Sequence, residues 1–413
     1  MANHEGRKKV CIISMTYWPI TPGQGTRVTK VYADLLREKF DLTVITSHVD
    51  NKKTKSFVVE YEDDGTKIVR IPSILFKNRA FFWRGLSIFF FTLSSILASK
   101  HIKKNSVIFS IGPPEVPYFV IASSFIKTLR TAKHLGLVTD MIPDVAFDIG
   151  LVRSEKLRNI IRSFCARAYR SVDHTVVITD YLKQKLVDYG VQDTKITNVG
   201  LAVDTNTFNP SKGISDPNAI AVRGHKDRFI VLYSGSFGQM YNFDPLLKAA
   251  KSIQKGNTKI HFVIRGDGDQ RRQIAEKIKE LDLQNVTLLG PVPNTDQIIS
   301  FINIASVCVI PIRNSRNIDM TYPSKLFEFW SCQRPVICSS KGETANLINR
   351  AKAGIAILPD DSTALIDAIM YLYNNPDLAK QMGTNGRRLV EKEFSYQNVA
   401  EKLTHVIQTM TNR

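Results

Sequence analysis

Two kinds of segment alternate along most of this chain: short runs rich in β-branched apolar residues, and longer amphipathic segments. The first kind predicts strands and the second helices, and their alternation is typical of a parallel sheet covered by helices. The first series of predicted strands comprises Val10–Ser14, Leu42–Thr46, Val107–Ser110, Leu135–Thr139 and Thr175–Thr179. The second series comprises Phe229–Tyr233, Ile260–Ile264, Val286–Leu289, Val307–Ile310, Pro335–Cys338 and Ile355–Leu358. The sequence therefore predicts an α/β protein with two Rossmann-like domains.

The boundary between the two series is a segment without apolar periodicity. Val203–Asp227 is rich in Asn, Pro, Ser, Gly and Asp, a composition that predicts a linker. We therefore expect an N-terminal domain over residues 1–205 and a C-terminal domain over residues 206–392, with a helical tail from Asp377 to Met410. Open α/β sheets bind ligands at the carboxyl ends of their strands, so we expect the two domains to face each other across a ligand-binding cleft.

The most apolar window of the chain, Ala80–Ala98, has three possible interpretations. Arg84 is its only charged residue and Ile88–Phe91 lies at its centre, but five Gly, Ser and Thr residues dilute it. About 20 apolar residues span a bilayer, so the window is a spanning helix, a buried core helix or a helix docked on the membrane interface. Basic residues on both sides suit anionic headgroups in the third interpretation: Lys77, Arg79, Lys100, Lys103 and Lys104.

Charge and cysteine content indicate the partners and the cellular compartment of the protein. The 413 residues include 56 Lys and Arg against 38 Asp and Glu, a net charge of +18, and residues 1–210 are the more basic part. Such a surface favours anionic partners. The five cysteines are widely spaced, without zinc-ligand spacing, which predicts reduced structural thiols. Met1–Lys9 is polar and leads directly into a strand, with no signal-peptide apolar region, so we expect a cytoplasmic protein.

Glycine-containing turns follow three of the predicted strands. Gly23 and Gly25 come after the first strand, where they form either a plain strand-to-helix turn or a loop whose backbone N–H groups approach a phosphate. Gly235 and Ser236 follow the first strand of the second series, and Arg265–Gly268 follows the next. Because neither the dinucleotide fingerprint nor the P-loop lysine motif is present, these turns indicate a nucleoside diphosphate held by backbone groups and one arginine.

The segment Pro323–Glu328 offers side chains for the same ligand. Ser324 is placed to cap a helix, with Lys325 in the first turn, where a lysine opposes the helix dipole unless a phosphate binds there. Glu328 lies one turn beyond Ser324 and can accept hydrogen bonds from the two vicinal hydroxyls of a ribose. The alternative is a solvated capping box, although Phe327 stands where that motif needs Glu or Gln.

Other chemistries have little support in the sequence. The histidines show no metal-binding spacing and no nucleophile elbow is present, which disfavours metallohydrolases and α/β-hydrolases. The basic helix Arg153–Arg170 is expected to lack interleaved exposed aromatic residues, so nucleic acid is not an expected partner.

The order and spacing of these pieces resemble the retaining family-4 glycosyltransferases of GT-B fold, in particular the branch that builds surface polysaccharides and lipid-linked oligosaccharides. The resemblance covers nearly the whole chain. The matching residues are Gly23 and Gly25, Asp140–Asp144, Asn198–Asp204 with Phe208 and Pro210, Gly235, Gly266–Gly268, and Pro323–Lys325 with Glu328.

The resemblance implies a sugar nucleotide bound by the C-terminal domain, an acceptor bound by the N-terminal domain, and a C-terminal helix over about residues 393–413 that packs back on the first domain. It also implies transfer without a metal ion or other cofactor, with Lys325 and Arg265 neutralising the diphosphate leaving group and Glu328 holding the ribose. The implied donor-binding residues are Gly23, Gly25, Gly235, Ser236, Arg265, Gly266, Gly268, Val292, Ser324, Lys325 and Glu328.

Asp140 is the candidate catalytic residue. It ends a predicted strand, where its carboxylate can orient or deprotonate an acceptor hydroxyl or stabilise positive charge on the donor sugar. The alternative is a capping or turn role before Pro143. Members of the family often have a histidine nearby, but His134 lies six residues upstream, inside the strand.

Two departures from the family pattern concern the donor. The family often carries a second glutamate eight positions before the one that matches Glu328, and Met320 stands there. Sugar recognition is therefore expected from Asp319, Met320 or Thr321. The common Gly-Arg pair, with a lysine after it, is replaced by Gly235-Ser236, which moves the phosphate-binding charge to Lys325 or Arg265.

Together, these expectations describe a metal-independent glycosyltransferase that moves a hexosyl or N-acetylhexosaminyl group, with retention, from a UDP-sugar to a lipid-linked glycan acceptor. It would associate with the inner face of the cell membrane through its basic N-terminal domain and Ala80–Ala98. The alternatives are a nucleotide-sugar epimerase of the same fold, or a non-catalytic partner of another transferase that binds nucleotide sugar or lipid.

Overall fold

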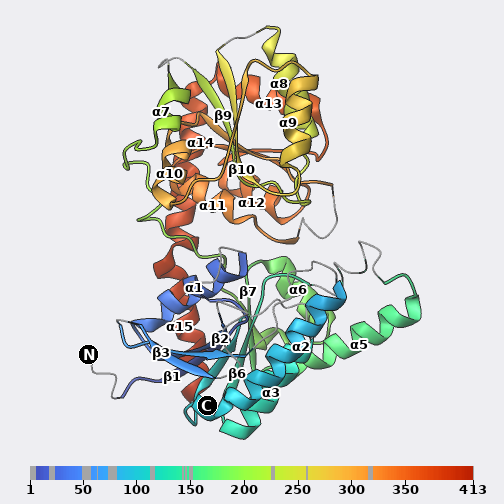
Figure 1. The fold of residues 1–413 in the computed structure, drawn as a ribbon, viewed down its shortest axis with the longest axis vertical. Helices are drawn as coiled ribbons and strands as arrows, with labels where there is room; N and C mark the ends of the chain where they lie inside the picture. Colours follow the sequence, from blue (N-terminus) through green and yellow to red (C-terminus); the bar gives the residue numbers. More distant parts are fainter. Residues whose placement is uncertain are drawn as a thin grey trace. The chain divides into compact units, whose positions relative to one another are not determined.

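The computed structural model divides the chain into two compact units, Met1–Gly200 with Val399–Arg413, and Leu201–Asn398 (Figure 1). It describes residues 6–17, 24–48, 57–62, 64–72, 81–111, 117–141, 144, 147, 152–224, 228–256, 259–314 and 320–412. The side chains of residues 24–27, 81–85, 88 and 117–122 are not among those described.

The first unit is built on an eight-stranded sheet with the order β3-β4-β2-β1-β5-β6-β7-β8 (Figure 1). Neighbouring strands run parallel except the edge pair β3 and β4. The strands are β1 (Lys9–Ile13), β2 (Asp41–Ser47), β3 (Val58–Tyr61), β4 (Lys67–Ile71), β5 (Val107–Ser110), β6 (Lys133–Val138), β7 (His174–Val177) and β8 (Ile196–Asn198). The helices are α1 (Gln24–Arg37), α2 (Phe81–Ala98), α3 (Pro117–Arg130), α5 (Glu155–Ser171), α6 (Asp180–Asp188) and α15 (Tyr396–Asn412), with short 3-10 turns at Ser99–His101 and Asp193–Lys195.

The second unit is built on a six-stranded parallel sheet with the order β11-β10-β9-β12-β13-β14. The strands are β9 (Phe229–Ser236), β10 (Ile260–Asp267), β11 (Val286–Leu289), β12 (Val307–Ile310), β13 (Val336–Ser339) and β14 (Gly354–Ile357). The helices are α7 (Pro217–Arg223), α8 (Asp244–Gln254), α9 (Arg271–Glu280), α10 (Thr295–Ile304), α11 (Ser324–Ser331), α12 (Glu343–Ala351), α13 (Ser362–Asn374) and α14 (Pro376–Leu389), followed by a π-helical turn, Val390–Phe394.

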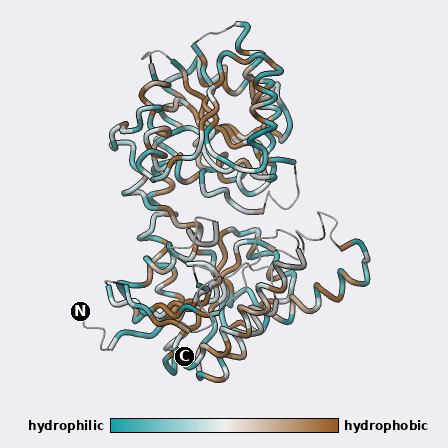
Figure 2. The backbone as a smooth tube through the Cα atoms, viewed as in Figure 1, coloured by the Kyte–Doolittle hydropathy of each residue, from teal (hydrophilic) through white to brown (hydrophobic). Residues whose placement is uncertain are grey.

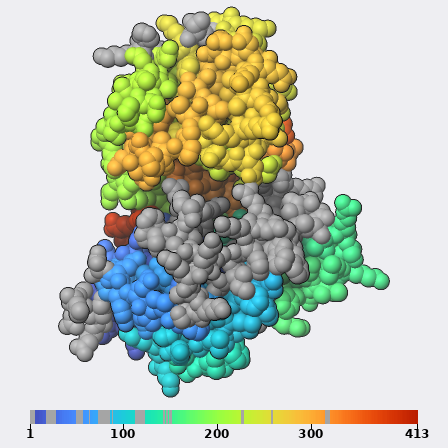
Figure 3. Space-filling model, in the orientation of Figure 1, coloured from blue at the N-terminus to red at the C-terminus, as the bar shows by residue number. Residues whose placement is uncertain are grey.

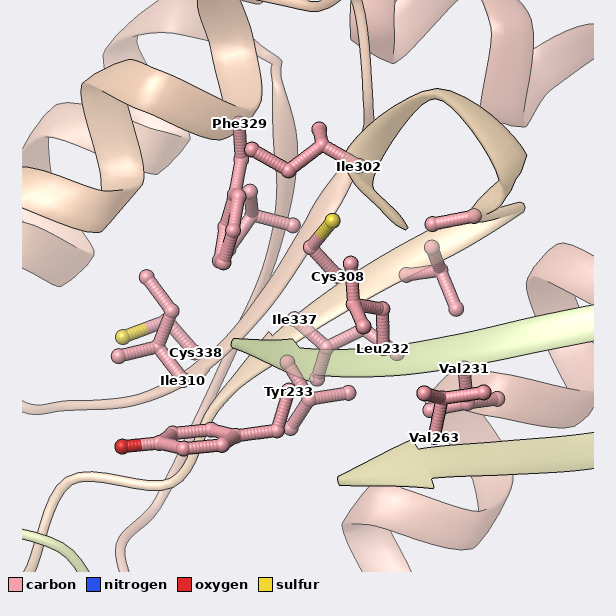
Figure 4. Close-up of a cluster of buried hydrophobic side chains, with 14 of the residues drawn as sticks. Val231, Leu232, Tyr233, Val263, Ile302, Cys308, Ile310, Phe329, Ile337 and Cys338 are labelled. Carbon is pink, nitrogen blue, oxygen red and sulfur yellow. The ribbon is translucent and has the colours of Figure 1, made fainter. Parts of the chain in front are cut away.

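Each sheet is the apolar centre of its unit, as the brown strands in Figure 2 show. All four residues of β5 and all four of β12 are buried, because helices cover both faces of a parallel sheet and leave no strand face in water. Figure 4 shows this packing in the second unit, where Val231 and Leu232 of β9 lie near Val263 of β10 and Cys308 of β12. All five cysteines are free and buried, as the sequence predicts.

Every strand predicted from the sequence is present, but three further strands were not predicted. β3 has mostly exposed residues, β4 carries two basic residues within five, and β8 is only three residues long. None of them gives the apolar run that marks a buried parallel strand.

The prediction of a linker over Val203–Asp227 was wrong. These residues belong to the second unit, and the segment forms helix α7, whose first N–H groups are capped by the buried Asp216 carboxylate. Phe208 and Ala219 of the same segment are buried in the core of the second unit. The polar residues that resembled a linker are therefore caps and turns on a packed surface.

The helical tail is interrupted where the chain leaves the second unit. The π-helical turn ends at Phe394, whose carbonyl accepts a 2.9 Å hydrogen bond from the Val203 amide, and the Tyr396 amide donates to the Val203 carbonyl at 3.1 Å. The two connections between the units therefore run side by side. The end of α15 belongs to the first unit, where Lys8 Nζ lies 2.6 Å from both Thr411 Oγ1 and Asn412 Oδ1.

Helix α2 fits neither the interpretation of the apolar window as a spanning helix nor that as a buried core helix. Phe91 and Ala98 lie in the core of the first unit, but Phe89, Leu93 and Leu97 are exposed. Of the helices in the described part of the chain, α2 included, none has both the length and the apolar character that crossing a membrane requires.

Candidate functional site

The candidate donor site lies where the second sheet changes direction. The chain runs from β9 outward to β10 and β11, then returns to β12 on the other side of β9, so the carboxyl ends of β9 and β12 form the topological switch point. The loops that leave these two strands pair through an isolated bridge between Tyr241 and Ile312. Crevices of this kind are where open α/β sheets bind their ligands.

Two glycines let the ends of β9 and β10 come close together. Gly235 and Gly266 both have positive φ values, 148° and 140°, that disfavour other residues. A Cβ at position 266 would lie 1.7 Å from the Gly235 carbonyl oxygen, and a Cβ at position 235 would lie 2.7 Å from Lys325 Nζ. The bare backbone at position 235 therefore leaves the space that the lysine occupies.

Lys325 reaches the end of β9 from the first turn of α11 and is buried there. Its Nζ donates a 2.8 Å hydrogen bond to the Tyr233 hydroxyl, and it lies 4.1 Å and 3.9 Å from the ring centroids of Tyr233 and Tyr241. Figure 4 shows Tyr233 at the edge of the apolar cluster, with its hydroxyl directed away from it. Aromatic faces attract a cation, so the two tyrosines partly replace the water that burial removes.

Burial lowers the pKa of Lys325 to about 7, and the charge of Glu328, three residues further along α11, favours the protonated form. Near neutral pH this lysine is therefore divided between its charged and neutral forms. An anion that bound beside Nζ would stabilise the charged form.

The sequence-based placement of Ser324 and Lys325 was wrong in two respects. Pro323, not Ser324, occupies the N-cap of α11, and no side chain among the described residues caps the helix. Lys325 is also not a surface lysine, because its side chain is buried together with the following Leu326. Ser324 is exposed, and Glu328 is half-buried one turn beyond it.

The side chain of Arg265 does not lie beside that of Lys325. Its guanidinium donates a 2.9 Å hydrogen bond to Ser234 Oγ and packs over the Phe301 ring of α10 at 5.2 Å. Ser234 follows Tyr233 on β9, and successive strand residues point to opposite faces of a sheet. The two cations therefore lie on opposite faces of the sheet. Burial lowers the pKa of Arg265, and the charge of Asp216 opposes this shift.

The other predicted donor-site positions differ in where they lie. Ser236 ends β9, Gly268 follows β10 and Val292 follows β11, so all three lie at the carboxyl edge of the sheet. Met320 is buried, and the Thr321 carbonyl accepts a hydrogen bond from Thr344 Oγ1. Gly25 lies in α1 of the first unit, while Gly23 and Asp319 are outside the described residues.

Asp140 lies two residues beyond the end of β6 in the first unit, next to the described Met141. It is half-buried, Thr139 Oγ1 donates a 3.2 Å hydrogen bond to it, and burial raises its pKa. Pro143, before which a turn role was the alternative, is outside the described residues. His134 is fully buried in β6, where Ser110 Oγ lies 2.9 Å from Nε2 and burial lowers its pKa to about 3.

Sequence reasoning missed the two tyrosines that surround Lys325. Tyr233 is 92 positions before the lysine in the chain, and it was predicted only as the last residue of a strand. The one available signal is the apolar pair Leu326–Phe327 directly after Lys325, which indicates that this turn of the helix is buried and that the lysine needs partners.

Comparison with known proteins indicates the class of protein that this chain resembles. Residues 216–389 match the family model described as glycosyl transferases group 1. The capsular polysaccharide biosynthesis glycosyltransferase CapM of Staphylococcus aureus is 23% identical over 313 residues, 74% of this chain and 78% of that protein. Sucrose-phosphate synthase from Thermosynechococcus elongatus has a TM-score of 0.76 at 17% identity, covering 98% and 99% of the two chains. HepE of Anabaena, solved with UDP-glucose, has a TM-score of 0.69 at 12% identity, covering 98% and 100%.

The two parallel-sheet units and these structural neighbours define the fold as GT-B. The family match over the second unit and the similarity to a polysaccharide-building transferase further indicate a glycosyltransferase of the group 1 type.

Proposed function

We propose that this protein transfers a sugar from a nucleoside diphosphate, with retention, to a lipid-linked glycan acceptor at the inner face of the cell membrane. The observation that carries the donor half of the proposal is Lys325, a buried lysine held between two tyrosines at the switch point of the sheet. In the part of the chain that the structure describes, no carboxylate forms a direct ion pair with Lys325. A buried cation without such a partner is costly, and a bound diphosphate would stabilise it.

In the proposed reaction the acceptor hydroxyl oxygen bonds to the anomeric carbon while the bond from that carbon to the diphosphate oxygen breaks. Lys325 stabilises the negative charge that develops on the departing diphosphate, the role that a metal ion has in other transferases. Glu328, on the same face of α11, accepts hydrogen bonds from the ribose hydroxyls. Asp140 orients the acceptor hydroxyl and accepts its proton on the carboxylate, or it stabilises positive charge on the donor sugar while the proton passes to the departing diphosphate oxygen.

Uridine is the proposed base, and this assignment is supported by the fold shared with HepE, which was solved with UDP-glucose. The sugar-reading residues remain Asp319, Met320 and Thr321, as expected from the sequence. A surface glycan is the proposed product because CapM acts in capsular polysaccharide biosynthesis. The relative and structures reported above give no support to the epimerase interpretation.

The test is calorimetric binding of UDP, GDP and ADP to the full chain, with and without magnesium. We expect one nucleotide to bind, indifferently to magnesium, and binding to weaken by about ten-fold or more in Lys325→Ala because one charge-assisted contact is lost. Glu328→Ala should weaken nucleotide binding but not inorganic diphosphate binding, since it removes only the ribose contact.

Lys248→Ala provides the matched control, because Lys248 is an exposed lysine of α8 in the same unit. It should bind nucleotide like the parent chain. Binding of none of the three nucleotides, or equal binding by Lys325→Ala and the parent, contradicts the donor site. Retention is tested separately, by the anomeric configuration of the product in NMR spectra.

A further inference from the structure

Three neighbouring helices of the first unit expose large apolar side chains to water. Helices α2 and α5 both pack against α3 (Figure 1), and α5 lies at the surface in green in Figure 3. The exposed apolar residues of these helices are 44–65% accessible: Phe89, Leu93 and Leu97 of α2, Phe125 and Leu129 of α3, and Leu157, Ile160 and Phe164 of α5. We call these eight residues the α2–α3–α5 surface.

Helix α2 buries Phe91 and Ala98 in the core of the first unit, but it also exposes an apolar stripe that a water-soluble helix ordinarily buries. Its exposed residues Phe89, Leu93 and Leu97 recur every four positions and form one stripe. On the buried side it carries Thr92 and Ser95, and Thr92 Oγ1 is buried without a hydrogen-bond partner in the described part of the chain. An amphipathic helix in water places its apolar stripe against the core, so the outward stripe of α2 indicates a second apolar environment.

Helix α5 adds charge to the same surface. Leu157, Ile160 and Phe164 have the spacing of one helix face, and Cys165 and Ala168 are buried on another side. The exposed Lys156 and Arg167 lie four positions before and seven after Ile160, on the apolar face. Neither makes an ion pair with any residue that the structure describes. The exposed Phe164 also corrects the expectation that this basic helix has no exposed aromatic residue.

We propose that the α2–α3–α5 surface docks the first unit on a bilayer that contains anionic lipids, with its apolar side chains among the acyl chains and Lys156 and Arg167 at the headgroups. Apolar residues bordered by cations are what such an interface binds, and this charge complementarity favours lipid over a second copy of the equally basic chain. The inference deepens the proposed function, since a lipid-linked acceptor would be reached at that interface.

The test is co-sedimentation of the full chain with vesicles of equal parts phosphatidylcholine and phosphatidylglycerol, and with phosphatidylcholine vesicles alone. We expect binding to the anionic vesicles, reduced about ten-fold or more in the double variant Ile160→Ser/Phe164→Ser. The matched control is Ile220→Ser/Tyr371→Ser, which removes apolar residues of similar exposure, 55% and 51%, from the second unit. This control should bind vesicles like the parent chain.

A second variant, Lys156→Gln/Arg167→Gln, tests the charge and keeps the apolar side chains of the surface. It should lower binding to anionic vesicles several-fold and remove the preference over neutral ones. Equal vesicle binding by both surface variants and the parent overturns the proposal. So does a parent chain that binds no vesicles but self-associates in sedimentation velocity, with the association lost in Ile160→Ser/Phe164→Ser.

Nucleotide binding separates this inference from the proposed function. The surface variants lie in the first unit and should bind UDP like the parent chain. Circular dichroism and thermal unfolding like those of the parent show that their first unit is folded. Failure of vesicle binding with intact UDP binding removes the docking surface alone. Failure of UDP binding by the parent chain, with vesicle binding intact, removes the donor site alone.

Discussion

The two units share one architecture but differ in how their exposed apolar side chains are grouped and in which cations they bury. In the described part of the second unit the exposed large apolar residues lie on separate elements: Ile220, Met240, Leu358 and Tyr371. Scattered apolar residues are ordinary on a protein surface. The same unit buries two cations, Lys325 and Arg265, near the ends of its strands.

In the first unit, by contrast, most of the exposed large apolar residues gather on α2, α3 and α5, and these helices have basic residues among them. A parallel sheet covered by helices needs neither feature for its stability. The two units therefore differ in where they carry side chains that folding alone does not require. In the second unit these are buried cations at the strand ends, and in the first they are exposed apolar residues on the outer helices. Those side chains are where we place donor binding and membrane docking.

The prediction with the largest expected effect concerns Asp140→Asn, which tests whether the first unit takes part in catalysis. If the first unit contributes a catalytic carboxylate, this nearly isosteric change should lower the turnover number by about 10²-fold or more while UDP binding is unchanged. The measurement is transfer of labelled sugar from the preferred donor, together with calorimetric UDP binding. The control is Asp188→Asn, which changes an exposed carboxylate at the end of α6 in the same unit. Full turnover by Asp140→Asn would leave the turn role as the better explanation.

The second prediction concerns the stability cost of the buried lysine. The pKa of Lys325 is lowered from 10.5 to about 7, so between these values the unfolded chain binds more protons than the folded chain. Its unfavourable contribution is therefore full below pH 7 and disappears as the pH rises towards 10.5. Lys325→Met should raise the free energy of unfolding by about 1–4 kcal/mol at pH 7, and by less at about pH 9.5.

Urea unfolding of Lys325→Met and the parent chain at the two pH values measures this effect. Lys248→Met, at the exposed position of α8, should leave stability unchanged at both. A loss of stability in Lys325→Met that is the same at both pH values would mean that the buried lysine stabilises the folded protein. A gain accompanied by loss of UDP binding would mean that the second unit gives up stability for its ligand.

The fold was largely predictable because a parallel strand buried on both faces leaves a continuous apolar run in the sequence, as in Val307–Ile310. The exposed edge strand Val58–Tyr61 leaves no such run. In the site, Lys325 was predictable from its neighbours in the chain, whereas its contact with Tyr233 depends on packing between segments 92 positions apart. Likewise, the burial of Ser95 and exposure of Leu97 on α2 depend on which side of that helix meets the sheet.

The smallest expected effect separates the ring of Tyr241 from its hydroxyl. Lys325 Nζ lies 3.9 Å from the centroid of this ring, whereas its hydrogen bond goes to the Tyr233 hydroxyl. Tyr241→Phe keeps an aromatic face and should leave UDP affinity within about two-fold of the parent, while Tyr241→Leu should weaken it by about two- to thirty-fold, because a cation–π contact contributes about 0.5–2 kcal/mol. Calorimetry at pH 7 measures both, with Tyr373→Leu in α13 as the control for loss of a tyrosine elsewhere in the unit. Equal weakening of UDP binding by the Phe and Leu variants would mean that Tyr241 acts through its hydroxyl and not through its ring. The aromatic rings around Lys325 would then not explain how the second unit keeps this cation buried before an anion binds.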